Sequence, residues 1–177
     1  MSERTISILK AAGVGALVVI AAVLLASRLS SSGRIGEEGL SIWFYDESEQ
    51  KLYAAPRDAI PPEKGIGGES GDGVRAVVVA CPGEQDNAAG RRIAYLEKYT
   101  PEMKELLERV QAARSAGRVC EETIPPADSE QFQRSVLVRR AGESEWHDTT
   151  TPEAREIMSE WRGWRSDDGQ PLIVCVP

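Results

Sequence analysis

The sequence contains little of what catalytic centres commonly use. It has one histidine, His147, and three cysteines, Cys81, Cys120 and Cys175. No two cysteines are separated by two residues, so the C-x-x-C arrangement that lowers a thiol pKa in redox loops is absent. The cysteines and the histidine also lack the paired short spacings of a zinc site. We therefore predict no catalytic residue, no cofactor and no metal site.

Two ligand-binding motifs are also missing. The segment 61–73 is rich in glycine, but it holds no G-x-x-x-x-G-K-[ST] string, and the strand-like run follows this segment instead of preceding it. No D-x-[DN]-x-[DN]-G calcium loop occurs anywhere in the chain. We expect 61–73 to form a loop, and the sequence implies no small-molecule ligand.

The cysteines leave one chemical alternative open. A thiolate could act as a nucleophile, in an enzyme or a redox protein, if folding brought a cysteine and His147 together. The simpler interpretation is a surface histidine and cysteines with structural roles. In an oxidising compartment we expect one disulfide between two of Cys81, Cys120 and Cys175, and the sequence does not indicate which two.

Long hydrophobic runs are absent except for one near the start of the chain. Residues 11–26 carry no charge and no polar side chain, and with its flanks the run reaches about 20 residues, the length that spans a hydrocarbon core. The residues after the run do not resemble a signal-peptidase site, which favours an uncleaved anchor. We expect an N-terminal tail at 1–10, a transmembrane signal-anchor helix at 11–29 and a tether at 30–39.

The remaining residues, 40–177, are predicted to form one extracytoplasmic domain, on the periplasmic side of an inner membrane. Residues 35–177 carry a net charge of −10, because four of the 21 basic residues but only one of the 28 acidic residues precede them. This acidic balance argues against a nucleic-acid partner. Besides the membrane, it leaves a protein partner or self-association.

The patterning of this domain indicates an α+β fold with a mixed or antiparallel sheet and two to three amphipathic helices. Strand-like runs and turn residues predict strands, and two Thr-Pro-Glu sequences are typical of helix starts. The predicted strands are a hairpin of 41–46 and 51–56, a buried strand at 74–81, and strands at 134–140 and 171–176. The predicted helices are a short one over 91–99 and longer ones from Thr100 and Thr151.

Aromatic residues make up only 6% of the chain, so their positions are informative. Trp43 and Tyr45 lie in the predicted hairpin on either side of a phenylalanine, which makes both faces of that strand apolar. Trp161 and Trp164 lie beside arginines at the end of the second long helix. Core packing is the simpler role for these side chains, and contact with a partner is the alternative. We take these four residues as the candidate interaction residues.

The apolar run, the polar tether and a hairpin of the form W-F-Y-D…K-L-Y resemble, in layout, pseudopilin-type envelope proteins and uncharacterised single-span exported proteins. The prepilin motif is absent, since no acidic residue lies in the apolar run. The resemblance implies a subunit of a secretion or pilus-type assembly, with helix contacts through Gly13 and Gly15. Our first hypothesis is a membrane-anchored, non-catalytic envelope protein that serves as a structural or interaction subunit of a larger assembly.

Overall fold

A computed structural model describes residues 41–68 and 70–177 of the chain. The predicted tail, transmembrane helix and tether lie outside these residues. Among the residues that are described, no helix has the length and apolar character needed to cross a membrane. Residues Ser41–Pro177 form one compact unit.

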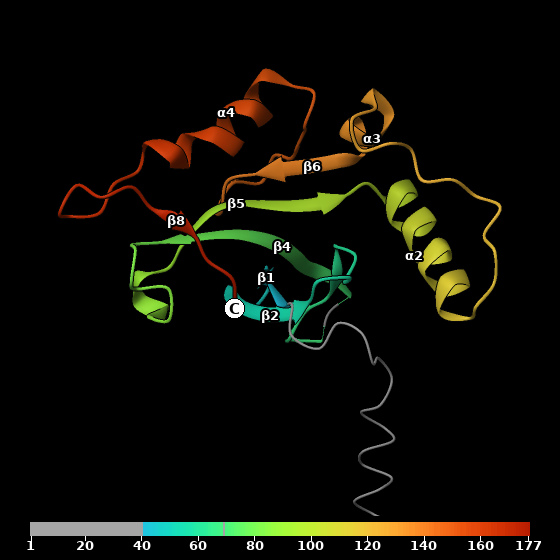
Figure 1. The fold of residues 1–177 in the computed structure, drawn as a ribbon, viewed down its shortest axis with the longest axis horizontal. Helices are drawn as coiled ribbons and strands as arrows, with labels where there is room; N and C mark the ends of the chain where they lie inside the picture. The colour runs from blue at the N-terminus through green and yellow to red at the C-terminus, as the bar shows by residue number, and fades with distance from the viewer. Residues whose placement is uncertain (1–40, 69) are drawn as a thin grey trace, which may run out of the picture. The chain divides into compact units, whose positions relative to one another are not determined.

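An antiparallel sheet organises this unit, with strands in the order β2-β1-β4-β5-β6-β7 and with β3 and β8 paired to β4 (Figure 1). The prediction of a small α+β domain is confirmed, and every pairing between described strands is antiparallel. The strands are β1 (Ser41–Asp46), β2 (Lys51–Pro56), β3 (Glu63–Lys64), β4 (Ser70–Ala80), β5 (Arg92–Tyr99), β6 (Val136–Arg139), β7 (His147–Asp148) and β8 (Ile173–Val174). The helices are α2 (Pro101–Ser115), α3 (Glu130–Ser135) and α4 (Pro152–Glu160), with short 3-10 turns η1 (Ala88–Gly90) and η2 (Trp161–Gly163).

The predicted hairpin is confirmed with its bounds. Strands β1 and β2 pair over six positions, from Ser41 opposite Pro56 to Asp46 opposite Lys51. Phe44 is fully buried, and its ring centroid lies 5.8 Å from that of Tyr53. Because successive side chains point to opposite faces of a strand, the neighbours of Phe44 point to the other face of the sheet.

The segment 61–73 differs from the predicted loop. It contributes the two-residue strand β3, and β4 begins at Ser70, four residues before the predicted strand. Between them, the backbone N–H of Gly65 donates to Asp72 Oδ1 at 2.9 Å. A Cβ at Gly65 would lie 2.3 Å from Asp46 Oδ2, so only glycine lets the loop approach these carboxylates.

The helix predicted over 91–99 is wrong, because these residues form β5 in the middle of the sheet. The register between β4 and β5 shifts after Val77, so that Val77 lies opposite Tyr95 but Val78 lies opposite Ile93. Ala94 is the extra residue of this bulge. The bulge places Ile93 and Leu96 on the same face although they are three residues apart, which is the spacing of a helix.

The two long helices begin as predicted. Thr100 Oγ1 accepts a hydrogen bond from Met103 N at 3.4 Å at the start of α2, and Thr151 Oγ1 accepts one from Ala154 N at 3.2 Å at the start of α4. Each helix has proline in its first turn, where a missing N–H costs nothing. The sequence analysis missed α3, whose last two residues had been assigned to the strand at 134–140.

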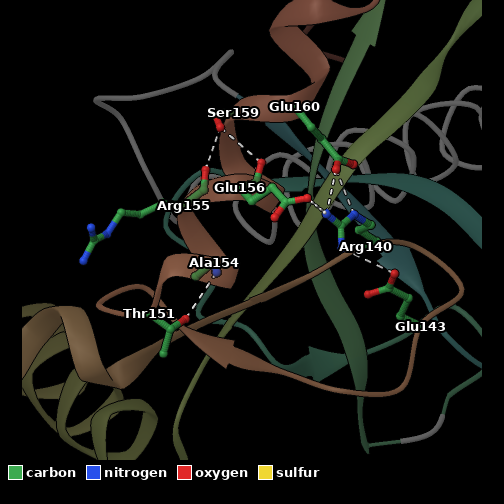
Figure 2. Close-up of polar contacts among 8 residues, drawn as sticks. All are labelled: Arg140, Glu143, Thr151, Ala154, Arg155, Glu156, Ser159 and Glu160. Atoms are coloured by element: carbon green, nitrogen blue, oxygen red, sulfur yellow. Dashed lines mark hydrogen bonds and ion pairs between the residues drawn. The ribbon is translucent and has the colours of Figure 1, made fainter.

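Helix α4 packs on β6 through buried side chains and a charged cluster. Val138 on β6 contacts Ala154 and Ile157 on α4, and all three are fully buried. At the end of β6, Arg140 Nε donates to Glu160 at 2.9 Å and Arg140 Nη2 to Glu156 at 3.3 Å (Figure 2). The hydrogen bond that Arg140 donates to Glu160 raises the pKa of Arg140. These contacts join the end of β6 to the last turns of α4.

The C-terminal strand is shorter than predicted. Only Ile173 and Val174 of the segment 171–176 pair with β4 as β8, opposite Ala80 and Val79. Cys175 continues the ladder with a hydrogen bond from its N–H to Val78 O at 2.9 Å, and it is buried. The chain end therefore lies along the same edge of β4 as β1.

Candidate functional site: an aromatic sheet face

The two faces of the sheet differ in what covers them. One face packs against α4, η2 and the segment that follows η2, through clusters that contain Trp161, Trp164 and Ile157. The opposite face has its own cluster, and none of the described residues in that cluster comes from a helix. We call this second face the aromatic face. Its buried members are Val74, Ala76, Val78, Ala80, Leu96 and Cys175, and the half-buried side chains packed against them are Trp43, Tyr45, Leu52, Ile93 and Trp146.

The four candidate interaction residues therefore fall into two separate groups. Trp43 and Tyr45 belong to the aromatic face, and Trp161 and Trp164 pack on the helix-covered face. All four are half-buried. The structure does not bring them together into a single surface.

Cations lie over the tryptophan rings of the aromatic face. The Arg91 guanidinium is 4.6 Å from the centroid of the Trp43 ring. Lys98 Nζ and the Arg139 guanidinium lie 4.2 Å and 4.6 Å from the Trp146 ring. Such contacts hold a cation against an aromatic ring by electrostatic attraction to its π face. The aromatic face is therefore also a basic one.

Burial leaves these cations in a poorly solvated setting. The Arg139 side chain is only 12% exposed and forms an ion pair with Glu47, in the turn between β1 and β2. Burial lowers the pKa of Arg139 and also that of Lys98. The ion pair connects β6 to the β1–β2 turn across the face, which shows that the sheet curves over it.

Two donors on this face have no acceptor among the residues that the structure describes. Trp43 Nε1 and Arg139 Nε are buried and make no hydrogen bond in the described part of the chain. Buried polar groups are normally paired, because an unpaired one costs about 1–3 kcal/mol. Arg75 Nε is a third such donor, and because it lies between Val74 and Ala76 it points to the opposite face, so unpaired donors do not distinguish the aromatic face.

The other tryptophan pair lies near a cavity whose lining includes Arg92 and Arg165. Trp164 lies under the Arg92 guanidinium, 4.2 Å from its ring centroid, and Trp161 Nε1 donates to Met158 O at 3.0 Å. The cavity has a volume of about 540 Å³, and its lining includes Cys81, Glu84, Arg92, Arg165 and Asp168. Both charge signs are present around the thiol, so the lining does not select one class of ligand.

The cysteines are free thiols. Cys175 is on the aromatic face, opposite Val78, whereas Cys81 packs with the cluster on the helix-covered face. A disulfide needs the two Cβ atoms about 3.8 Å apart, which side chains on opposite faces of a sheet do not reach. Cys120 follows α2 and lines a separate cavity with Val110 and Glu122.

These positions predict how the thiols react. In the folded chain, a maleimide reagent should label the half-buried Cys81 and Cys120, whereas Cys175 should react only after denaturation, since it is buried and burial raises the pKa of its thiol. Intact mass before and after denaturation counts the labels, and peptide mapping locates them. A single labelled thiol in unreduced, denatured protein would instead reveal the disulfide expected from the sequence.

The register of the sheet separates His147 from Cys81. His147 lies opposite Val138, Val138 opposite Glu97, and Glu97 opposite Arg75, so His147 and Arg75 are three strands apart. Cys81 lies six residues further along the chain than Arg75, or roughly 20 Å along the strand direction. A proton transfer between this thiol and the imidazole is therefore not possible in this fold.

The acidic groups near the β1–β2 turn have structural roles. Asp46 is fully buried and accepts hydrogen bonds from Glu49 N at 2.8 Å and Gly67 N at 3.0 Å, and Ser48 Oγ donates to Asp46 and Asp72. These bonds, led by that from Glu49 N, lower the pKa of Asp46 to about 2. No group of three or more potential metal ligands occurs among the described residues.

Sequence reasoning found two of the residues that form the aromatic face and missed the others. Trp146, Arg91, Lys98 and Arg139 were not singled out, because their common face depends on strand β5 and its bulge. One signal was present: the segment 91–99 has basic residues near both ends and the apolar residues Ile93, Ala94 and Leu96 between them.

Comparison with known protein families, curated proteins and solved structures finds no match to this chain.

Proposed function

We propose that this chain is a non-catalytic, membrane-anchored envelope protein whose folded domain binds a protein partner through the aromatic face. The apolar run of residues 11–26 supports the anchor, since its length and lack of charge suit a bilayer-spanning helix. The folded domain then lies outside the membrane, on the periplasmic side. An anchored domain of this kind acts by holding a partner at the membrane.

The observation that carries the proposal is that the cluster on the aromatic face contains no described helix residue. Trp43, Tyr45 and Trp146 lie half-buried over a buried row of β4, and none of the described apolar residues in their cluster belongs to a helix. Aromatic residues and arginine are the residue types that contribute most to protein interfaces.

The thiol-dependent alternative receives less support. Cys81 does line a cavity, but His147 is several strands and roughly 20 Å away, so the thiol has no imidazole base. The pseudopilin-like alternative depends on Gly13 and Gly15, which lie outside the described residues. Neither alternative has an observation in the folded domain that favours it over a binding role.

Site-specific photo-crosslinking tests the proposed function. A photoreactive phenylalanine analogue at Tyr45, in the full chain expressed in its native host, should give a discrete crosslinked product in the membrane fraction, because the ring lies on the proposed interface. The matched control carries the analogue at Val119, which is 94% exposed in the segment after α2. We expect at least about tenfold more product at Tyr45, as fits a specific interface.

The same adduct from both positions, or no adduct at Tyr45 in a chain that is folded and membrane-bound, would contradict the proposal. A free, unanchored chain in the soluble fraction would contradict its membrane part alone.

A further inference from the structure

The aromatic face carries a charge opposite to that of the domain as a whole. Residues 35–177 have a net charge of −10, yet the face presents three cations, Arg91, Lys98 and Arg139. Glu47 neutralises only Arg139. Net charge alone would favour a basic partner, whereas the local charge on this face favours an acidic one.

Two of these cations have no counter-charge within residues 41–68 and 70–177. Among the described residues, Lys98 has its contact with the Trp146 ring and no carboxylate in ion-pair distance. Arg91 rests on Trp43 and donates from Nε to Gln85 O at 2.9 Å, again without a carboxylate. Cations held against aromatic rings in this way are already oriented, so a carboxylate that pairs with them orders little more of the protein.

The positions of these cations limit the shape of the partner. Arg91 and Lys98 mark the two ends of one row along β5, with Ile93 and Leu96 between them. The bulge at Ala94 leaves about six residue steps, or roughly 20 Å along the strand, between the backbones of these two residues. An extended segment with acidic side chains about six residues apart and apolar side chains between them matches both ends and the centre of the row.

We propose that the partner presents an acidic, extended protein segment to the aromatic face, with one carboxylate near Arg91 and another near Lys98. This inference rests on the proposed function and adds the chemistry of the partner. Trp43 lies under Arg91, so an acceptor near that guanidinium is also close to the ring.

A pair of synthetic peptides tests this proposal. The probe is a fluorescein-labelled peptide of about seven residues with glutamate at both ends and leucine and threonine between them, and its counterpart has glutamine in place of both glutamates. Fluorescence anisotropy measures binding to the full chain in non-ionic detergent. We expect the glutamate peptide to bind at least about tenfold more tightly, and this preference should fall in about 0.5 M salt, which screens exposed charges.

Matched variants locate the effect. The double variant Arg91→Gln/Lys98→Gln should lose the preference for the glutamate peptide. Arg118→Gln/Arg155→Gln, which changes net charge equally at exposed positions away from the aromatic face, should keep it. The charge-preserving variant Arg91→Lys/Lys98→Arg should also keep it, and this guards against a loss caused by misfolding.

Several outcomes would overturn the proposal. Equal binding of the two peptides, or equal losses in the two glutamine double variants, would show that the face does not select acidic groups. Selective binding that appears only after Glu37→Gln/Glu38→Gln would show that the chain's own acidic residues occupy the face. If the Tyr45 crosslink persists while the glutamate peptide neither binds nor competes, the interface is real but its partner is not acidic. If neither the Tyr45 crosslink nor binding of the glutamate peptide is observed, the proposed function is contradicted as well.

Discussion

Replacing Leu96 by alanine is expected to lower the free energy of unfolding by about 3 kcal/mol. Leu96 is fully buried in the central strand β5 and packs in the cluster with Val74 and Val78. Truncation removes apolar contact and leaves a cavity that strands held on both sides cannot collapse to fill. Urea unfolding, followed by the tryptophan fluorescence of the domain, measures the change.

The control for this variant is Val119→Ala. Val119 is 94% exposed, so the change should stay within about 0.5 kcal/mol of the unaltered chain. A decrease of less than about 1 kcal/mol in the free energy of unfolding for Leu96→Ala would mean that the aromatic face is not packed as described. The half-buried tryptophans would then not rest on a well-packed layer of side chains.

Asp46 should make the fold sensitive to acid. Its carboxylate is buried and accepts backbone hydrogen bonds from Glu49 and Gly67, which lower its pKa from 3.8 to about 2. Because the folded state has the lower pKa, the stabilisation is complete above the unfolded value, near pH 4, and is lost as the pH falls towards 2. The unfolding temperature of the domain should therefore fall steeply between pH 4 and pH 2.

The variant Asp46→Asn tests this assignment. An amide places a donor where the loop needs acceptors, so the unfolding temperature at pH 7 should fall by at least about 5 °C. The further decrease in unfolding temperature between pH 4 and pH 2 should be smaller than in the unaltered chain. Asp86→Asn, at an exposed loop position, should leave both values unchanged. If Asp46→Asn keeps the full pH dependence, other carboxyl groups cause the acid transition.

Local signals in the sequence were sufficient for the hairpin and the two long helices. The β1–β2 hairpin has aromatic strands and a short polar turn, and the helices α2 and α4 begin with threonine caps and proline in the first turn. These features act over a few residues, so the sequence window that contains them is enough.

Strand β5 could not be found in this way. Its segment contains leucine, glutamate, lysine and alanine, which favour helices, and the bulge at Ala94 gives its apolar residues a helical spacing. Pairing with β4 and β6 on both sides outweighs these local preferences. Strand pairing is a long-range property that a single segment does not reveal.

Prediction of the candidate site also required knowledge of strand β5. Trp43 and Tyr45 were found because three aromatic residues are consecutive in β1. That Arg91 and Lys98 lie on the same face as these rings follows only once β5, its bulge and its register with β4 are known. Net charge is a sum over the whole domain, so it does not reveal that one face of an acidic domain is basic.

The most direct test of the central claim is the yield of crosslinked product at Tyr45 relative to Val119 in membranes of the native host. A protein-binding aromatic face predicts a discrete adduct at Tyr45 that exceeds the Val119 control at least about tenfold. Equal yields at the two positions, in a chain that is folded and held at the membrane, would show that the aromatic face has no partner and would contradict the account.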